Sequence, residues 1–162
     1  MYKIEFKDAI LPKYSELRPF YEGLAAVKNQ DGLWGYINKK GEVIIPFKYE
    51  DASKFSEALA AVKSFEKPGY QYIDKNDEVQ IEKFYKLANP FKNGHAIVSL
   101  LNSGVYDKYS YIDKNGTENC GYTNADDFDD DFALAKYGGA VFFIEENDFK
   151  ARNRIQLIPS VE

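Results

Sequence analysis

The residues that could do covalent chemistry are few, and they do not match the spacing of known catalytic motifs. The chain of 162 residues holds one histidine, His95, and one cysteine, Cys120. A nucleophilic cysteine needs a base beside it, so the fold would have to bring these two residues together. The sequence contains no nucleophile elbow, phosphate-binding glycine loop, dinucleotide fingerprint or H-E-x-x-H zinc motif. We therefore expect no enzyme activity.

The carboxylates offer a second kind of chemistry. Asp127, Asp129 and Asp131 stand at alternate positions, the spacing that opens a calcium-binding loop. The rest of that template fails, because Phe132 occupies the position of the sharp-turn glycine and Gly138 that of the bidentate glutamate. Paired carboxylates also serve glycosidases, which is the alternative for this run. We interpret it as surface charge and expect no metal ion and no cofactor.

The formal net charge of −5 is unevenly distributed. Residues 117–149 carry nine acidic side chains and one lysine, which gives this stretch −8 and the rest of the chain +3. Such a stretch repels a phosphate backbone, so we expect no nucleic-acid partner. It attracts a basic protein surface, and the alternative is a solvated edge without a partner.

Membrane association and export are not predicted either. No apolar run approaches the roughly 18 residues that span a bilayer. The first twelve residues, MYKIEFKDAILP, interleave charged and apolar side chains and do not resemble a signal peptide. We expect a cytoplasmic protein.

The chain repeats itself with a period of about 36 residues, and these repeats must position any site. The segment Phe20–Val27 recurs as Phe55–Val62, and Tyr36–Gly41 recurs as Tyr72–Asp77 and as Tyr111–Gly116. A fourth copy begins at Phe128. His95 occupies the position of Leu24 and Leu59, which favours a packed histidine over a catalytic one, and Cys120 is expected to be a buried or incidental thiol.

Each copy predicts short strands joined by tight turns. In the first copy Leu24–Val27 and Leu33–Ile37 flank a turn, and a second turn leads into Val43–Ile45. The Gly138-Gly139 pair is a two-residue hairpin signal in the fourth copy. Pro46 cannot donate to a strand ladder and is expected to end the third strand, with one helical turn around residues 50–53.

A unit of three strands cannot bury its apolar face alone, so neighbouring units must stack. The predicted fold class is all-β, a tandem array of about four three-stranded β-meander repeats of about 36 residues each. We assign residues 1–162 to a single repeat domain, with a partial unit at 1–19, repeats at 20–54, 55–90 and 91–127, and a degenerate repeat at 128–162. An open superhelical stack is preferred, and a closed propeller-like ring is the alternative. The recurring Tyr36, Tyr72 and Tyr111 are expected to pack between units, with ligand stacking as the alternative.

The first full unit resembles the bacterial WG repeat, also called the KWG repeat. The resemblance is carried by residues 22–27, 33–37 and 41–46 and by Tyr49. The Trp34-Gly35 pair of this unit is replaced in the later units by Tyr70-Gln71, Tyr109-Ser110 and Val141-Phe142. The resemblance implies a β-rich binding scaffold without a common set of catalytic residues. It also implies kinship with toxin-neutralising proteins, because some such repeats occur in proteins that neutralise toxins used in bacterial competition.

The hairpin loops are where the copies differ most. Eight residues separate Val27 from Tyr36, and the equivalent gaps in the later copies hold nine, twelve and seven residues. Loops tolerate such change and often carry recognition. The longest loop, residues 99–110, is unusually apolar and suits a protein partner, with a capping role as the alternative.

These observations predict a non-enzymatic protein-binding module, specifically an immunity-type protein that binds a bacterial toxin with a basic surface. The candidate partner-binding residues come from the acidic run and from the apolar loop: Asp126, Asp127, Asp129, Asp130, Asp131, Leu100, Leu101, Val105, Tyr106 and Tyr109. The alternatives are a glycan or cell-wall binding module that uses exposed Tyr and Trp faces, and a structural scaffold. A hydrolase would need a pocket that joins His95, Cys120 or the aspartates.

Overall fold

The computed structural model describes residues 13–101, 108–127 and 132–145. Within these ranges the chain forms thirteen β-strands and no α-helix, and none of its segments is a helix that could cross a bilayer. The strands are β1 Glu16–Leu17, β2 Leu24–Lys28, β3 Trp34–Asn38, β4 Val43–Ala52, β5 Ala60–Ser64, β6 Tyr70–Ile73, β7 Val79–Ala88, β8 His95–Leu100, β9 Tyr109–Asp113, β10 Glu118–Tyr122, β11 Asn124–Ala125, β12 Phe132–Tyr137 and β13 Ala140–Glu145.

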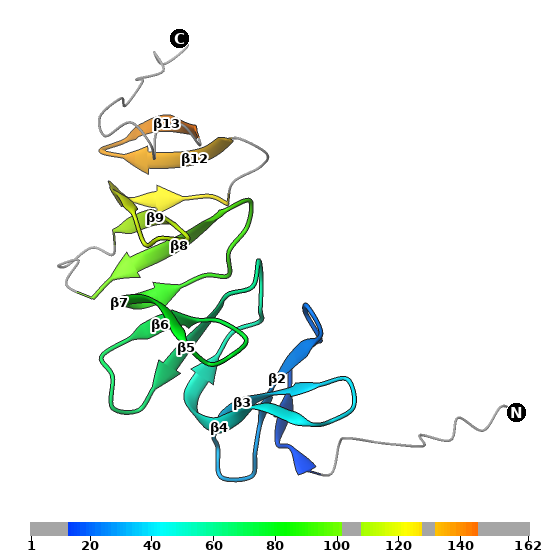
Figure 1. Ribbon diagram of the computed structural model, residues 1–162. Coiled ribbons are helices and arrows are strands. Elements are labelled where there is room, and N and C mark those ends of the chain that lie inside the picture. Colours follow the sequence, from blue (N-terminus) through cyan, green and yellow to red (C-terminus); the bar gives the residue numbers. More distant parts are fainter. Residues whose placement is uncertain (1–12, 102–107, 128–131, 146–162) are drawn as a thin grey trace, which may run out of the picture.

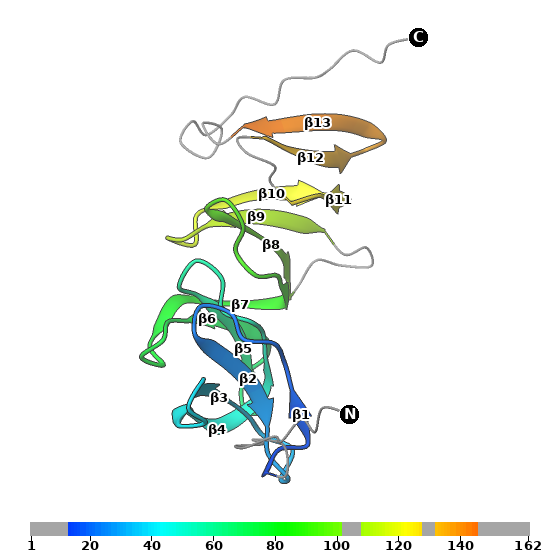
Figure 2. The same ribbon diagram turned by 90° about the vertical axis from the view of Figure 1, so that its right-hand side faces the viewer.

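All neighbouring strands pair antiparallel and in chain order. Strands β1 to β10 form one sheet, and β11 to β13 form a second sheet. The two sheets coil into an elongated stack with β1 near one end and β13 at the other (Figures 1 and 2). The all-β repeat array is therefore confirmed. It is open, because β1 pairs with β2 and lies far from β13, so the alternative of a closed ring is wrong.

The long strands β4 and β7 are each shared by two units. The first part of β4 pairs with β3, where Ile45 lies opposite Tyr36, and its last part pairs with β5, where Ala52 lies opposite Val62. Strand β7 joins the next two hairpins in the same way. In the third unit this long strand is divided into β10 and β11, and the register shifts at the end of β10.

The connector between units corrects two predictions. Residues 50–52 continue β4 and form no helical turn, and Pro46 does not end the ladder. Between its pairs with Tyr36 and Trp34, β4 contains a bulge that includes Pro46, where no ladder donor is required. Gly35 faces this bulge, since a Cβ at Gly35 would lie 2.7 Å from the carbonyl oxygen of Ile45. The glycine therefore permits a close approach of two backbones.

The recurring tyrosines pack between units, as predicted. Tyr36, Tyr72 and Tyr111 are fully buried. Each hydroxyl donates to a carbonyl oxygen on the segment that enters the next unit, at 2.6 Å in all three cases: Tyr36 to Ser53, Tyr72 to Asn89 and Tyr111 to Asp126. Burial raises the pKa of all three hydroxyls, so they remain neutral donors. The rings of Tyr36 and Tyr72 also meet Phe55 and Phe91 edge to face, with centroids 4.8 and 5.0 Å apart.

Candidate functional site

The strands end at two opposite edges of the stack. We call the hairpin edge the one where β2 joins β3, β5 joins β6, β8 joins β9 and β12 joins β13. We call the opposite edge the turn edge. It holds the entry turns 21–24, 56–59 and 92–95, which lead into β2, β5 and β8. It also holds the turns 38–42, 74–78 and 113–117, which follow β3, β6 and β9. The register of β2 against β3 shows the arrangement, because Lys28 faces Trp34 at the hairpin edge and Leu24 faces Asn38 at the turn edge.

The turn edge has the same backbone geometry in successive units. The two central residues of each entry turn both have positive φ, between 50° and 88°, the geometry of a type I′ turn: Glu22-Gly23, Glu57-Ala58 and Asn93-Gly94. In the other set of turns one side-chain oxygen accepts the backbone N–H groups two and four residues later. The residues that do this are Asn38, Asp74 and Asp113.

Glutamates also connect neighbouring units along the turn edge. The carboxylate of Glu22 accepts the N–H of Ala58 at 3.1 Å and pairs with Lys75 at 3.2 Å. Glu57 repeats this one unit later, with Gly94 at 3.0 Å and Lys114 at 3.0 Å. Partial burial raises the pKa of Glu22, but the hydrogen bonds and the charge of Lys75 outweigh it, so its pKa lies below the ordinary value. The carboxylates of Glu22 and Glu57 therefore bind groups of the neighbouring unit.

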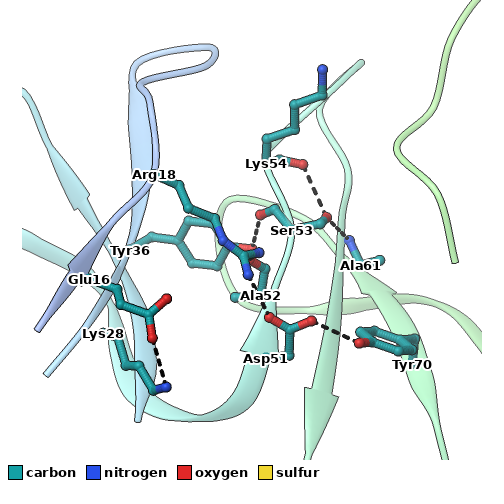
Figure 3. A network of polar contacts seen from close by, with 10 residues as sticks. All are labelled: Glu16, Arg18, Lys28, Tyr36, Asp51, Ala52, Ser53, Lys54, Ala61 and Tyr70. Carbon is teal, nitrogen blue, oxygen red and sulfur yellow. Dashed lines mark hydrogen bonds and ion pairs between the residues drawn. The ribbon is translucent and has the colours of Figure 1, made fainter. Parts of the chain in front are cut away.

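A polar network joins Arg18, Asp51, Ala52 and Tyr70 (Figure 3), and its Arg18 covers the single tryptophan at the hairpin edge. The Arg18 guanidinium lies 4.2 Å above the ring of Trp34, which is 3% exposed. Arg18 also donates to the Ala52 carbonyl at 2.5 Å and to Asp51 at 3.0 Å. Tyr70, from the next hairpin, donates to the other oxygen of Asp51 at 2.7 Å, and burial together with Asp51 raises the pKa of Tyr70 to about 12. This network links three successive units, and no local pattern around Arg18 could have indicated it.

The residues considered for catalysis do not converge. His95 is buried in β8, and its Nδ1 lies 3.0 Å from the carbonyl oxygen of Asn93. Cys120 lies in β10, and its side chain is outside what the structure describes. His95 pairs with Asp113 on one side of β9, whereas Cys120 pairs with Ser110 on its other side. Two strand spacings therefore separate their backbones, and they form no adjacent pair.

Among the described residues, no group of three or more His, Cys, Asp or Glu could hold a metal ion. Of the three aspartates with the spacing of a calcium loop, Asp129 and Asp131 lie outside the described residues.

The candidate residues of the apolar loop lie at the hairpin edge. Leu100 ends β8 and packs against the core, Leu101 follows it and is 36% exposed, and Tyr109 begins β9 partly buried. Val105 and Tyr106 lie outside the described residues. Phe65 and Tyr137, which the sequence did not single out, lie at the same edge and are 60% and 55% exposed. The repeat could have indicated Phe65, which follows Val62 by three residues as Leu101 follows Val98, whereas Tyr137 follows Ala135 by two and had no such signal.

The acidic run lies elsewhere. Asp126 and Asp127 are exposed and follow β11, and the N–H of Asp126 donates to the Leu134 carbonyl at 2.9 Å. Asp126 corresponds to Ser53, which leads into the turn edge at residues 56–59. Asp129, Asp130 and Asp131 lie outside the described residues. The described members of the two predicted groups are therefore directed to opposite edges and do not form one surface.

Comparison with known proteins gives a family match and similarities to solved structures. Residues 9–34 and 34–64 match the model described as the WG containing repeat. No curated protein matches the chain. The fold is similar to that in the crystal structure of the computationally designed Ika4 protein, at 9% sequence identity and a TM-score of 0.49. That alignment covers 78% of this chain and 87% of the designed one.

Proposed function

We propose that the protein is a non-enzymatic protein-binding module, on the premise that its residues 9–64 match the model of the WG containing repeat. The observation that carries the proposal is the contrast between its two edges. The turn edge repeats the same turns and uses Glu22 and Glu57 for contacts between units, whereas the loops of the hairpin edge differ in length from one unit to the next. Variable loops on a regular scaffold are a common arrangement for recognition.

The burial of the recurrent rings favours a protein partner over a glycan. Sugar-binding sites stack exposed aromatic faces against the ligand, but Trp34, Tyr36, Tyr72 and Tyr111 are all buried here. The aromatic content of the chain is thereby used in its core. Of the rings that remain exposed, Phe65 and Tyr137 lie at the hairpin edge, which suits apolar contacts with a protein.

Within this class we favour an immunity-type protein that neutralises a bacterial toxin by direct binding. The support is the resemblance of the first unit together with the acidic stretch at residues 117–149. Exposed carboxylates such as Asp126 and Asp127 would attract a basic toxin surface and accelerate its association at low salt.

The test uses the full chain as bait in its native lysate, followed by measurement of affinity with the purified partner. One variant bait carries lysine at Asp126, Asp127, Asp129, Asp130 and Asp131. A control bait carries Asp31→Lys and Glu82→Lys, two exposed acids away from the run. A stoichiometric partner lost by the first variant and kept by the control would support a binder of basic proteins, and loss of a toxic activity on mixing would support immunity. Retention of polysaccharide instead of any protein would overturn the proposal.

A further inference from the structure

We propose that the outward face of the β12–β13 hairpin docks a β-hairpin of a partner protein that carries small aliphatic side chains at alternate positions. This hairpin is the last described element at its end of the stack (Figures 1 and 2). The inference rests on the proposed protein-binding function, and it names the surface and the kind of segment that this surface accepts.

Each hairpin inside the stack has two faces, one toward the preceding unit and one toward the next. Ala60 packs in one cluster with Tyr36 of the first unit, whereas its neighbour Ala61 packs on the other face, in the cluster of the third unit. In the fourth unit Ala133 takes the position of Ala60 and packs with Tyr111 of the third unit. The other face of the β12–β13 hairpin therefore carries the positions that each earlier hairpin buries against the next unit.

This outward face is exposed and apolar. Leu134 lies opposite Phe143 in the strand register, and the two residues are 41% and 50% exposed. The residues equivalent to Leu134 lie opposite the recurring tyrosines and are at most 6% exposed: Ala26, Ala61 and Ile97. Val141 on β13 is 42% exposed, whereas Trp34 at the equivalent position is 3% exposed. Terminal repeats of a stacked array need a polar outer face, so an apolar one indicates a surface that is covered on binding.

The opposite end of the stack is covered within the chain. The face of the first hairpin that points away from the second unit carries Ala25, Val27 and Ile37, which are all 0% exposed. Tyr14 and Phe20, from the segment before β2, pack against it. A second copy would have to displace this segment before the two ends could join, which argues against a second copy as the occupant.

The three junctions inside the chain show which surface fits the outward face. At each junction the covering hairpin presents small aliphatic side chains at alternate positions of its first strand: Ala60 and Val62, Ala96 and Val98, and Ala133 and Ala135. Their small size leaves room for the large ring of the preceding unit. The sequence of residues 146–162 contains no such pair, so we assign the covering hairpin to a partner protein.

The aromatic residue of the last hairpin also favours an apolar contact. Tyr36, Tyr72 and Tyr111 each donate to a carbonyl oxygen on the segment that enters the next unit. Phe143 has no hydroxyl, so burying its ring leaves no side-chain donor without an acceptor. A partner hairpin can therefore cover it through apolar contacts, and its binding should depend only weakly on salt.

The test measures the binding of a labelled synthetic peptide with the sequence of residues 53–74, which contains β5 and β6, to the full chain by fluorescence anisotropy. The face variant carries Leu134→Ser and Val141→Ser. The matched control carries Val43→Ser and Val79→Ser, which are 48% and 47% exposed and lie in β4 and β7. Circular dichroism and thermal unfolding check that both variants fold. The peptide should bind the face variant at least about tenfold more weakly than the parent, and the control within about twofold of the parent.

Two variant peptides test which side of the hairpin makes the contact. Ala60→Asp changes the side that packs on Tyr36 inside the chain, and Ala61→Asp changes the opposite side. The first change should weaken binding at least about tenfold and the second less than about threefold. Equal effects of the two changes would contradict the proposed orientation and overturn the inference.

Three further results would overturn the inference. A dimer of the full chain that dissociates in the face variant, measured by analytical ultracentrifugation, would assign the face to a second copy. Binding of the peptide only after Leu157→Ser and Ile158→Ser would assign the face to the segment 146–162 of the same chain. Absence of binding before and after these changes would exclude this kind of partner. In each case the proposed function stands if the parent and the face variant capture the same protein from the lysate, and it falls too if neither captures a protein.

Discussion

Ala58 is the position where a single substitution should stabilise the fold. It is the second central residue of the type I′ turn 56–59 and has φ of 70°, in the left-handed region. The equivalent residues of the flanking units are glycines, Gly23 at 88° and Gly94 at 78°. Ala58 is exposed, so its methyl group contributes little burial. The hydrogen bond to Glu22 uses the backbone N–H of Ala58 and survives a change to glycine.

The expected change in the free energy of unfolding on Ala58→Gly is the sum of two opposing contributions. An L-residue in the left-handed conformation costs about 1–2 kcal/mol, which Ala58→Gly removes. Glycine gains conformational entropy in the unfolded chain, which offsets about 0.4–1 kcal/mol of that gain. The net stabilisation should be about 0.5–1 kcal/mol, a rise in Tm of about 2 °C for a chain of this length.

The reverse changes provide the matched control. A Cβ added at Gly23 or at Gly94 meets nothing within 4 Å, so Gly23→Ala and Gly94→Ala introduce backbone strain without a steric clash. Each should destabilise the protein by about the same 0.5–1 kcal/mol. The assay is urea unfolding followed by circular dichroism, with the midpoints compared at a common slope.

Two combinations of unfolding results would contradict this role of the left-handed turn residues. If Ala58→Gly is neutral or destabilising while Gly23→Ala and Gly94→Ala are also neutral, the left-handed geometry of these turns does not determine stability. If only Ala58→Gly departs from expectation, the turn 56–59 alone has a different conformation from the one described. NMR of the amide protons of residues 56–59 would then show a different turn.

Three further outcomes are expected from the same unfolding assay. Tyr72→Phe removes the donor to the Asn89 carbonyl and should cost about 1–2 kcal/mol, whereas Tyr85→Phe removes a buried hydroxyl that has no hydrogen-bond partner among the described residues and should be neutral or stabilising. Gly35→Ala should cost about 1–3 kcal/mol, because its Cβ forces the bulge of β4 to move; an unchanged midpoint would contradict the close approach. Because its folded pKa is lowered, Glu22 contributes stability that is complete above its unfolded pKa and is lost as the pH falls through the folded value. Glu22→Gln should therefore flatten the loss of stability below about pH 4.5, and an unchanged acid profile would count against the bond to Ala58.

The features predicted correctly from the sequence are those that depend on local pattern. Gly138-Gly139 forms the tight hairpin between β12 and β13 with both φ values positive, because glycine adopts that geometry without steric cost. The buried tyrosines followed from their recurrence at a fixed spacing. The match of residues 9–64 to the WG containing repeat agrees with the resemblance of the first unit.

The features that were wrong or missed depend on residues distant in sequence. Pro46 is compatible with a continuous strand only because the bulge lies opposite Gly35, which the Pro46 segment alone does not reveal. Trp34 is buried because Arg18, sixteen residues earlier, covers its ring. The separation of the acidic run from the apolar loop needed the strand register, since both are near in sequence but belong to opposite ends of their strands.

The division of the third long strand into β10 and β11 has a consequence for cooperativity. Elsewhere a continuous strand passes from one unit to the next, so separating those units would break a ladder on both sides of it. At the last junction the two sheets meet through packed side chains and the Tyr111 hydroxyl, with no shared ladder. Strands β12 and β13 can therefore open and close as a separate foldon, and their amides should exchange with solvent deuterium earlier than those of β5 and β6, at the middle of the stack.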